Sequence, residues 1–320
     1  MNIAIKSILI FLVAVSFMSC CTEEKSNQNQ PSVISPKTVY LVLKSLGNPF
    51  FRDIQTGVED ACDSNIIIQV RSGEDESDII GQTQILESIV NASVKDSISG
   101  VILSPSSSGG ELLGYIKQLQ NRNIPVILVD TRIDSSLLAQ YNIKPLPFIT
   151  SSNIDGGAQA AEFIVSQLQK GRTSILLLGG VESQETAIQR KEGFENYLKT
   201  VPIKYDVKYR EARWSRIEAQ TITASFYSAG MKFDAIFAAN DEMALGALQA
   251  TMNKNILPKP IIVGFDAIDE AKISIHKNGL NATIAQNPKE MGRKAIEILD
   301  SIWQNGDIEI ANYIQTQVVK

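Results

Sequence analysis

Polar side chains follow several apolar runs of the chain directly, at the places where strands of a parallel sheet would end. Asp130 comes after the run 125–129, Asp266 after 261–265 and Gln286 after 282–285. In open parallel sheets, ligands bind beyond the carboxyl ends of the strands. The same criterion, extended to nearby helices and loops, gives a full set of candidate ligand-binding residues: Lys44, Asn48, Phe50, Phe51, Asp130, Arg190, Trp214, Asn240, Asp266 and Gln286.

The types of side chain in this set suit a polyol. Carboxylate, amide and guanidinium groups can each bond two neighbouring hydroxyls, and charge-assisted hydrogen bonds are roughly twice as strong as neutral ones. Phenylalanine and tryptophan rings offer flat apolar surfaces to the C–H faces of a sugar. The joint placement of both kinds of group predicts a site for a small sugar.

Each residue also has an ordinary structural explanation when it is taken alone. An Asp or Asn after a strand is commonly a helix cap, and we expect that role for Asp241. Phe50 or Phe51 could belong to the core, Arg190 could pair with Glu192, and Trp214 could cover an edge. The prediction of a ligand site therefore depends on the set and not on any single member.

Short apolar runs alternate with segments of helical period from residue 38 onward, which predicts an α/β fold with parallel sheets. Two such series predict two doubly wound lobes. Residues 132–150 lack clear periodicity and contain two prolines, so we expect the chain to cross between lobes there, with a boundary near Ser151. The predicted strands are 39–43, 66–70, 100–103, 125–129, 174–178, 205–210, 235–238, 261–263 and 282–285. The predicted helices are 50–63, 79–94, 111–120, 156–169, 186–198, 216–228, 242–252, 267–277 and 288–303.

The first residues have the pattern of a bacterial export signal. Lys6 precedes an apolar run that ends in small residues and is shorter than the ~20 residues that cross a bilayer. Residues 1–19 are therefore predicted to be a signal peptide. Residues 17–20, Phe-Met-Ser-Cys, resemble a lipobox, which makes Cys20 the predicted lipidation site, with Cys21 or plain secretion as alternatives. Residues 20–36 are polar and predict a lipidated tether, which would place the protein in the periplasm or cell envelope, anchored to the membrane.

Composition excludes several classes of partner. The chain has 320 residues and a net charge of −5 without a basic run, which argues against nucleic acid. Cys62 is the single cysteine after the tether and His276 the single histidine. We therefore expect no disulfide framework, no metal site and no cofactor.

An ordered series of segments resembles the periplasmic sugar-binding proteins of the ribose-binding type over nearly the whole mature length. The segments are 38–51, 125–130, 151–157, 190–194, 237–248, 263–266 and 282–286. The resemblance implies that Asn48, Asp130, Arg190, Asn240, Asp266 and Gln286 bond sugar hydroxyls, while Phe50, Phe51 and Trp214 sandwich the ring. Lys44, Thr131 and Trp214 stand where the ribose binder has serine, arginine and phenylalanine, so a pentose, a hexose and a cyclic polyol all stay open.

The resemblance also implies a type I periplasmic binding fold with a three-segment hinge. The N-terminal lobe would comprise residues 37–151 and 287–313, and the C-terminal lobe residues 152–286 and 314–320. A monomer would deliver its sugar to the permease of an ABC transporter, or present it to a sensor kinase.

Three other functions compete with sugar transport. Asp130 and Asp266 could be the paired carboxylates of a glycosidase, but both stand where a hydroxyl-binding partner is expected, so we predict no enzyme. A sugar-responsive transcription regulator would begin with a basic helix-turn-helix rather than an export signal. A binder of a non-sugar signal, such as a furanosyl autoinducer or an amino acid, is the third.

Overall fold

The computed structural model describes residues 36–169 and 171–320 of the chain. The predicted signal peptide, the predicted lipidation site Cys20 and all but the last residue of the predicted tether lie outside these ranges. Within the described ranges, no helix combines the length and the apolar character that a membrane crossing needs.

The first of two sheets contains six parallel strands in the order β11-β5-β4-β3-β1-β2. The order β2-β1-β3-β4-β5 is that of a doubly wound sheet. Its strands are β1 (Lys37–Leu43), β2 (Ile66–Ser72), β3 (Ile98–Leu103), β4 (Val126–Val129), β5 (Phe148–Ser151) and β11 (Ala311–Ile314). The helices of this lobe are α1 (Pro49–Ala61), α2 (Ile79–Ala92), α3 (Leu113–Asn121), α4 (Ser135–Gln140) and α10 (Pro288–Trp303).

The second sheet has the order β12-β10-β9-β8-β6-β7, and all its pairs are parallel except β10 with β12. Its strands are β6 (Ser174–Gly179), β7 (Asp206–Glu211), β8 (Ala235–Ala238), β9 (Ile261–Asp266), β10 (Ala282–Ala285) and β12 (Gln317–Val319). The helices of this lobe are α5 (Asn153–Gln167), α6 (Glu185–Thr200), α7 (Arg216–Ser228), α8 (Asp241–Asn253) and α9 (Asp269–His276). The predicted α/β fold with two parallel-sheet lobes is confirmed.

One stretch of the sequence prediction is wrong. Residues 132–150 were expected to be an aperiodic crossing, but they contain helix α4 and most of strand β5, which lies inside the first sheet. Elements of three to six residues are too short to show a clear hydrophobic period. The strands β11 and β12 were missed for the same reason.

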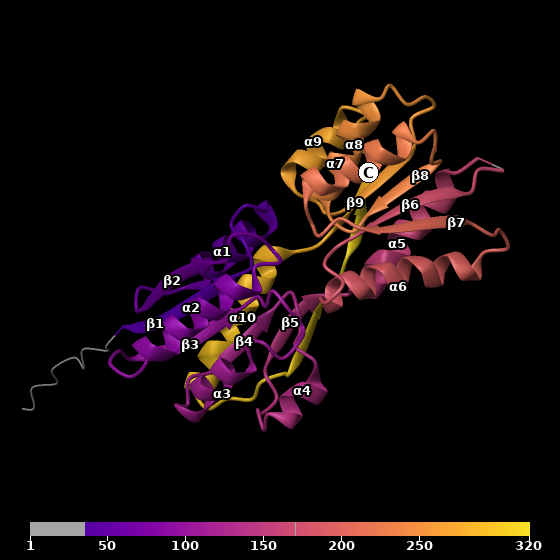
Figure 1. Ribbon diagram of the computed structural model, residues 1–320. Coiled ribbons are helices and arrows are strands. Elements are labelled where there is room, and N and C mark those ends of the chain that lie inside the picture. Colours follow the sequence, from indigo (N-terminus) through magenta and orange to yellow (C-terminus); the bar gives the residue numbers. More distant parts are fainter. Residues whose placement is uncertain (1–35, 170) are drawn as a thin grey trace, which may run out of the picture. The chain divides into compact units, whose positions relative to one another are not determined.

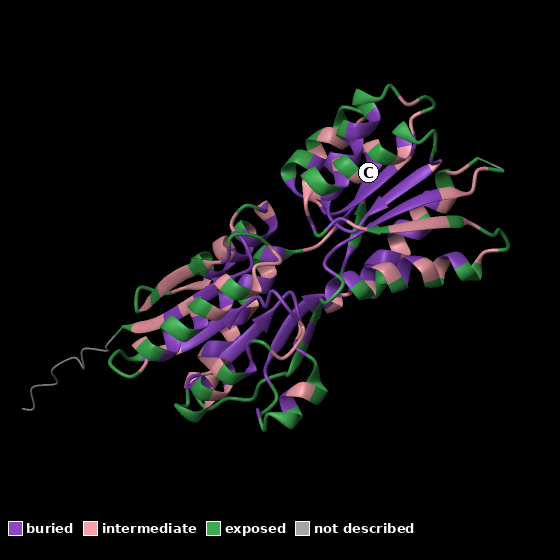
Figure 2. Ribbon diagram, viewed as in Figure 1, coloured by how far each residue is buried: buried purple, intermediate pink, exposed green. Residues whose placement is uncertain are grey.

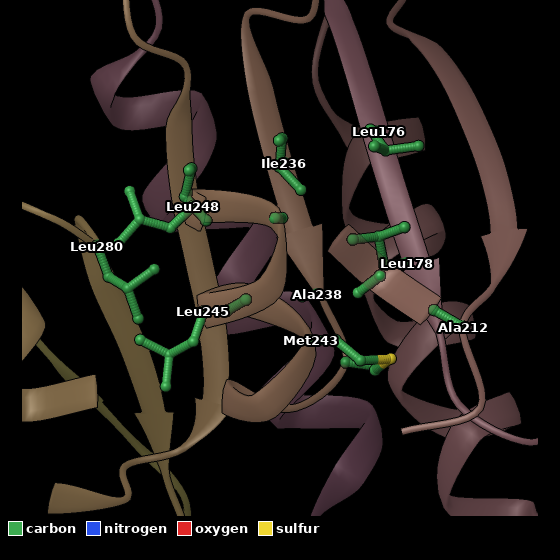
Figure 3. Packing of buried hydrophobic residues seen from close by; sticks show 14 of the residues in the cluster. Leu176, Leu178, Ala212, Ile236, Ala238, Met243, Leu245, Leu248 and Leu280 are labelled. Atoms are coloured by element: carbon green, nitrogen blue, oxygen red, sulfur yellow. The ribbon is translucent and has the colours of Figure 1, made fainter. Parts of the chain in front are cut away.

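Helices cover both faces of each sheet, as Figure 1 shows within each lobe. In the first lobe, α1 and α10 pack on one face, and α2 and α3 on the other. In the second lobe, α5 and α6 lie opposite α7 and α8. The central strands are accordingly buried, whereas the helices are exposed on their outer sides (Figure 2). Figure 3 shows part of one such layer, in which Leu176 and Leu178 lie on β6 and Ile236 on β8, while Leu245 and Leu248 of α8 point toward Leu280.

Helix α10 follows the last parallel strand of the second sheet and yet packs on α1 of the first lobe. The two helices meet backbone to backbone at Gly292. A Cβ atom at this position would lie 2.2 Å from the carbonyl oxygen of Ile54 and 2.7 Å from the amide nitrogen of Val58. The return of the chain to the first lobe thus depends on a residue without a side chain.

We expect Gly292→Ala to lower the free energy of unfolding by roughly 1–3 kcal/mol, because the helices must separate to admit the methyl group. Urea denaturation followed by circular dichroism measures this. Gly114→Ala in α3 is the control: nothing lies within 4 Å of a Cβ there, and alanine should stabilise the helix by roughly 0.5–1 kcal/mol. Equal effects of the two substitutions would contradict the packing account.

Candidate functional site

One cavity gathers nearly all of the predicted ligand-binding residues. Of the predicted set, Gln286 alone is not among the lining residues, but its Nε2 donates to Oδ1 of Asp266 over 2.6 Å. The lining residues are Lys44, Asn48, Phe50, Phe51, Glu76, Asp130, Thr186, Arg190, Trp214, Asn240 and Asp266.

The Lys44 ammonium is fully engaged by protein groups. Its side chain is 1% exposed, and Nζ donates to Oδ2 of Asp130 (2.8 Å), Oγ1 of Thr131 (2.7 Å) and Oε1 of Gln184 (3.2 Å). An ammonium has three protons, so none remains for a ligand in this arrangement. Lys44 and Thr131 both bond the same oxygen of Asp130, Oδ2. No group in the described part of the chain donates to Oδ1 of Asp130, so this oxygen can accept from a ligand.

Arg190 is the corresponding cation of the second lobe. Its Nε donates to Oδ1 of Asn153 (2.8 Å) and its Nη1 to the carbonyl of Ala239 (2.6 Å), while Nη1 also lies 3.5 Å from Oδ1 of Asp266. Its partner is therefore Asp266 and not Glu192. The guanidinium lies over the ring of Phe265 at 3.8 Å. Among the described residues Nη2 has no hydrogen-bond acceptor, and its two protons are available to a ligand.

Three residues that line the cavity have left-handed backbone conformations. The φ angles are +69° for Asp130, +65° for Trp214 and +112° for Asp266. Such conformations are uncommon in residues other than glycine and concentrate at functional sites. At Asp130 the conformation is supported by Thr150, whose hydroxyl donates to the Asp130 carbonyl over 2.8 Å.

Two lining asparagines are helix caps as well. Oδ1 of Asn48 accepts from the amide of Phe50, and Oδ1 of Asn240 accepts from the amide of Met243. The predicted cap at Asp241 is therefore wrong, because Asn240 caps α8. Oδ1 of Asp241 accepts from Thr283 Oγ1 and Oδ2 from the amide of Ile268, in a fully buried position outside the cavity.

Phe50 and Phe51 are both buried and have a dual character. Their rings meet edge to face, with centroids 5.2 Å apart, and both belong to the core between α1 and the sheet. Both also line the cavity, together with Trp214. The core explanation and the ligand-site prediction are thus compatible.

The sequence analysis missed Glu76 and Thr186, which line the cavity, and Gln184, which lies beside it. Glu76 is in the loop that follows β2, at the same edge of the sheet as Lys44 and Asp130. The strand-end criterion could have found it, but the loop holds several acidic residues and Glu76 lies four positions beyond the strand. The hydroxyl of Thr186 is buried and has no hydrogen-bond partner in the part of the chain that the structure describes.

Burial raises the pKa values of two lining carboxyls. The pKa of Glu76 rises from 4.5 to about 7, chiefly through desolvation, although its carboxyl accepts a hydrogen bond of 2.9 Å from Nδ2 of Asn48. Desolvation likewise raises the pKa of Asp266 to about 8, against the opposing effect of Arg190. Near neutral pH these carboxyls can therefore either donate or accept a proton in a hydrogen bond.

No group of three or more His, Cys, Asp or Glu side chains within the described ranges is placed to hold a metal ion. Cys62 is half-buried at the end of α1, where its thiol donates to the carbonyl of Val58.

The raised pKa of Glu76 gives a sign for the pH dependence of stability. The folded state holds this proton up to about pH 7, whereas the unfolded chain releases it near pH 4.5. The contribution of protonated Glu76 to the free energy of unfolding is therefore fully present below pH 4.5 and is lost as the pH rises through about 7. Between pH 4.5 and about 7 this proton makes the free energy of unfolding fall as the pH rises. In Glu76→Gln the fall should be less steep, by a slope that corresponds to at most one proton. Urea denaturation at a series of pH values measures it, with Glu74→Gln, an exposed neighbour, as the control. A Glu76→Gln slope that equals the wild-type slope would contradict this assignment.

Comparisons with known proteins agree with the architecture. The D-allose-binding periplasmic protein of Escherichia coli is 28% identical over 270 residues, which are 84% of this chain and 85% of that protein. The ribose import binding protein of Bacillus subtilis is 28% identical over 300 residues and 92% of each chain. A periplasmic solute-binding protein of Actinobacillus succinogenes, solved with bound D-allose, is 24% identical. Its TM-score is 0.80, with 89% of this chain and 97% of that chain covered; this likeness is one of fold.

A family model described as a periplasmic binding protein domain matches residues 39–307, which include every residue that lines the cavity and all strands of both sheets except β11, β12 and the first two residues of β1. The function of this family is binding and not catalysis. The chain belongs to the periplasmic binding protein domain family.

Proposed function

We propose that this chain captures a monosaccharide or cyclic polyol between its two lobes and delivers it to the permease of an ABC transporter. The observation that carries the proposal is the cavity itself, because unused hydrogen-bonding atoms and aromatic rings line the same small volume. Oδ1 of Asp130, Nη2 of Arg190 and Oγ1 of Thr186 are these free atoms. A neutral ligand with several hydroxyls can satisfy all three.

The charges of the cavity support a neutral ligand. Lys44 is paired with Asp130, and Arg190 lies beside Asp266. Lys44 therefore has a carboxylate partner and no proton left for an anionic ligand. The pKa of Asp266, about 8, means that this carboxyl compensates the charge of Arg190 only in part near neutral pH. The aromatic residues Phe50, Phe51 and Trp214 would cover the C–H faces of the ring.

The names of the relatives narrow the class of ligand. Two of them are named for D-allose and ribose, so a pentose or an aldohexose is the first choice, and cyclic polyols stay in the set. Lys44 would act through Asp130, whose free oxygen would accept from the sugar, rather than by bonding the sugar itself.

The proposal includes a movement of the lobes and a lipid anchor. The N-terminal lobe would comprise residues 37–151 and 287–313 and the C-terminal lobe residues 152–286 and 314–320, with three crossings as the hinge. Because ligand contacts come from both lobes, the sugar would favour the closed state by its differential affinity for that state. Lipidation at Cys20 would hold the protein at the membrane. A sensor kinase is the alternative receiver of the closed form.

A thermal-shift screen of residues 32–320 against pentoses, aldohexoses, inositols and amino acids tests the function. A ligand at about 100 times its Kd adds about 2.7 kcal/mol to the free energy of unfolding, so one sugar should raise Tm by several degrees. Shifts with amino acids alone, or no shift with any compound, would refute the proposal.

Substitutions then test the site. Asp130→Ala and Arg190→Ala should each weaken binding by about 2–5 kcal/mol, because each removes a ligand contact and leaves a buried ionisable group without its partner. Isothermal titration calorimetry with the best sugar of the screen measures this. Asp134→Ala, at the exposed cap of α4, is the matched control. Asp241→Ala should lower the free energy of unfolding by about 1–3 kcal/mol and retain binding. Equal loss of binding in all four variants would refute the assignment.

A further inference from the structure

The side-chain amide of Gln184 lies between the two lobes with every hydrogen-bonding position occupied. The residue is 0% exposed. Its Nε2 donates to the carbonyls of Glu76 (2.8 Å) and Ser106 (2.9 Å), and its Oε1 accepts from Nζ of Lys44 (3.2 Å) and Nε1 of Trp214 (2.9 Å). A primary amide offers two donors and two acceptor sites, so Gln184 is saturated.

The four partners of Gln184 are divided between the lobes. Gln184 precedes α6 of the second lobe, and Trp214 follows β7 of the same lobe. Lys44, Glu76 and Ser106 follow β1, β2 and β3 of the first lobe. Three of its hydrogen bonds therefore exist only while the lobes are in contact, and the fourth fixes a ring that lines the cavity.

We infer that Gln184 is a positioning residue. Its bonds to Lys44, Glu76 and Ser106, which we call the clasp, hold the two lobes together over the ligand, and its bond to Trp214 orients the indole. Gln184 itself does not touch the ligand. The inference rests on the proposed sugar-binding function and deepens it. Lys44 and Trp214 bond the same oxygen, so one amide serves both the interlobe contact and the orientation of the indole. The indole is limited on its other side by Gly180, where a Cβ would lie 2.0 Å from Cζ2 of Trp214.

The first-lobe side of the clasp is held by a second buried amide. Oε1 of Gln82 accepts from the amide of Ser106 (2.7 Å), and Nε2 of Gln82 donates to the carbonyl of Ser104 (2.9 Å). These bonds aim the Ser106 carbonyl at Gln184. These bonds lie within the first lobe, so the Ser106 carbonyl keeps its position when the bonds of Gln184 across the lobes are broken.

Other interlobe contacts surround the clasp but are more exposed. The amide of Glu185 donates to Oγ of Ser108 (3.0 Å), and the carboxylate of Glu185 pairs with Arg132, whose side chain is 42% exposed. Solvent-exposed ion pairs contribute little. Glu185→Gln thus offers a matched control that weakens an interlobe ion pair one residue away.

The test compares wild type with Gln184→Met and Glu185→Gln. Methionine has nearly the length of glutamine but cannot form these hydrogen bonds. In an open conformation water can hydrate the groups that lose Gln184, so the free energy of unfolding without sugar should stay close to wild type. That measurement separates loss of the clasp from loss of the fold.

The first arm contains no sugar and measures hydrogen exchange of the Trp214 indole N–H by NMR. The chain has two tryptophans, and the signal absent from Trp303→Phe identifies the other as Trp214. We expect exchange at Trp214 to be faster in Gln184→Met than in wild type, while Glu185→Gln resembles wild type. Equal exchange rates in all three proteins would overturn the inference.

The second arm measures D-allose binding by calorimetry and its dissociation by stopped flow. Gln184→Met loses the three interlobe bonds, and each has a net value of about 0.5–1.5 kcal/mol. The affinity should therefore fall roughly ten- to a thousandfold, mainly through faster dissociation. Unchanged affinity and dissociation would overturn the inference. If wild type binds no sugar while the first arm gives the expected difference, the proposed function fails and the orientation of Trp214 by Gln184 stands.

Discussion

The buried ammonium of Lys44 is the charge on which the arrangement of the site depends. An isolated charge in the interior is very unfavourable, and removal of one partner of a buried pair costs about 3–5 kcal/mol. The three partners of Lys44 come from the loop after β4 and from the turn before α6. Each of these segments must therefore hold its position while Lys44 is buried. The pairing also accounts for the left-handed backbone of Asp130, because this conformation directs its carboxylate at the ammonium of Lys44.

In the second lobe the buried cation is Arg190, and its charge likewise requires partners. The guanidinium of Arg190 is planar, so it can lie flat over Phe265 and direct its donors in the plane at Asn153 and the Ala239 carbonyl. A lysine could not form this set of contacts. Left-handed conformations of the kind found at Asp130, Trp214 and Asp266 cost of order 1–3 kcal/mol each. The hydrogen bonds of the two cations and the sheets beneath them offset this cost, so the loops are already formed when a ligand arrives.

Sequence reasoning predicted the two lobes and most of the cavity for one reason. In a parallel sheet the strand ends converge, so Asp130, Asp266 and Asn240 could be placed together from their positions after apolar runs. Gln184 could not be found in this way, because it lies five residues beyond β6 and three of its four partners belong to the other lobe. No local pattern encodes such a partner. Asn240 shows a second limit: a cap and a cavity residue have the same sequence pattern, and this residue is both.

The neutral amide at position 184 suits a clasp that must open. Its partners are hydrated when the lobes separate, so each bond contributes only about 0.5–1.5 kcal/mol net. A ligand can shift a two-state equilibrium only by its differential affinity for the two states. If the clasp were much stronger, the lobes would stay closed without a ligand, and closure would no longer report on binding. A glutamate at this position would add a full charge beside Lys44 and would repel the carbonyls of Glu76 and Ser106. An amide satisfies donors and acceptors together, and it leaves the larger share of the closing free energy to the ligand.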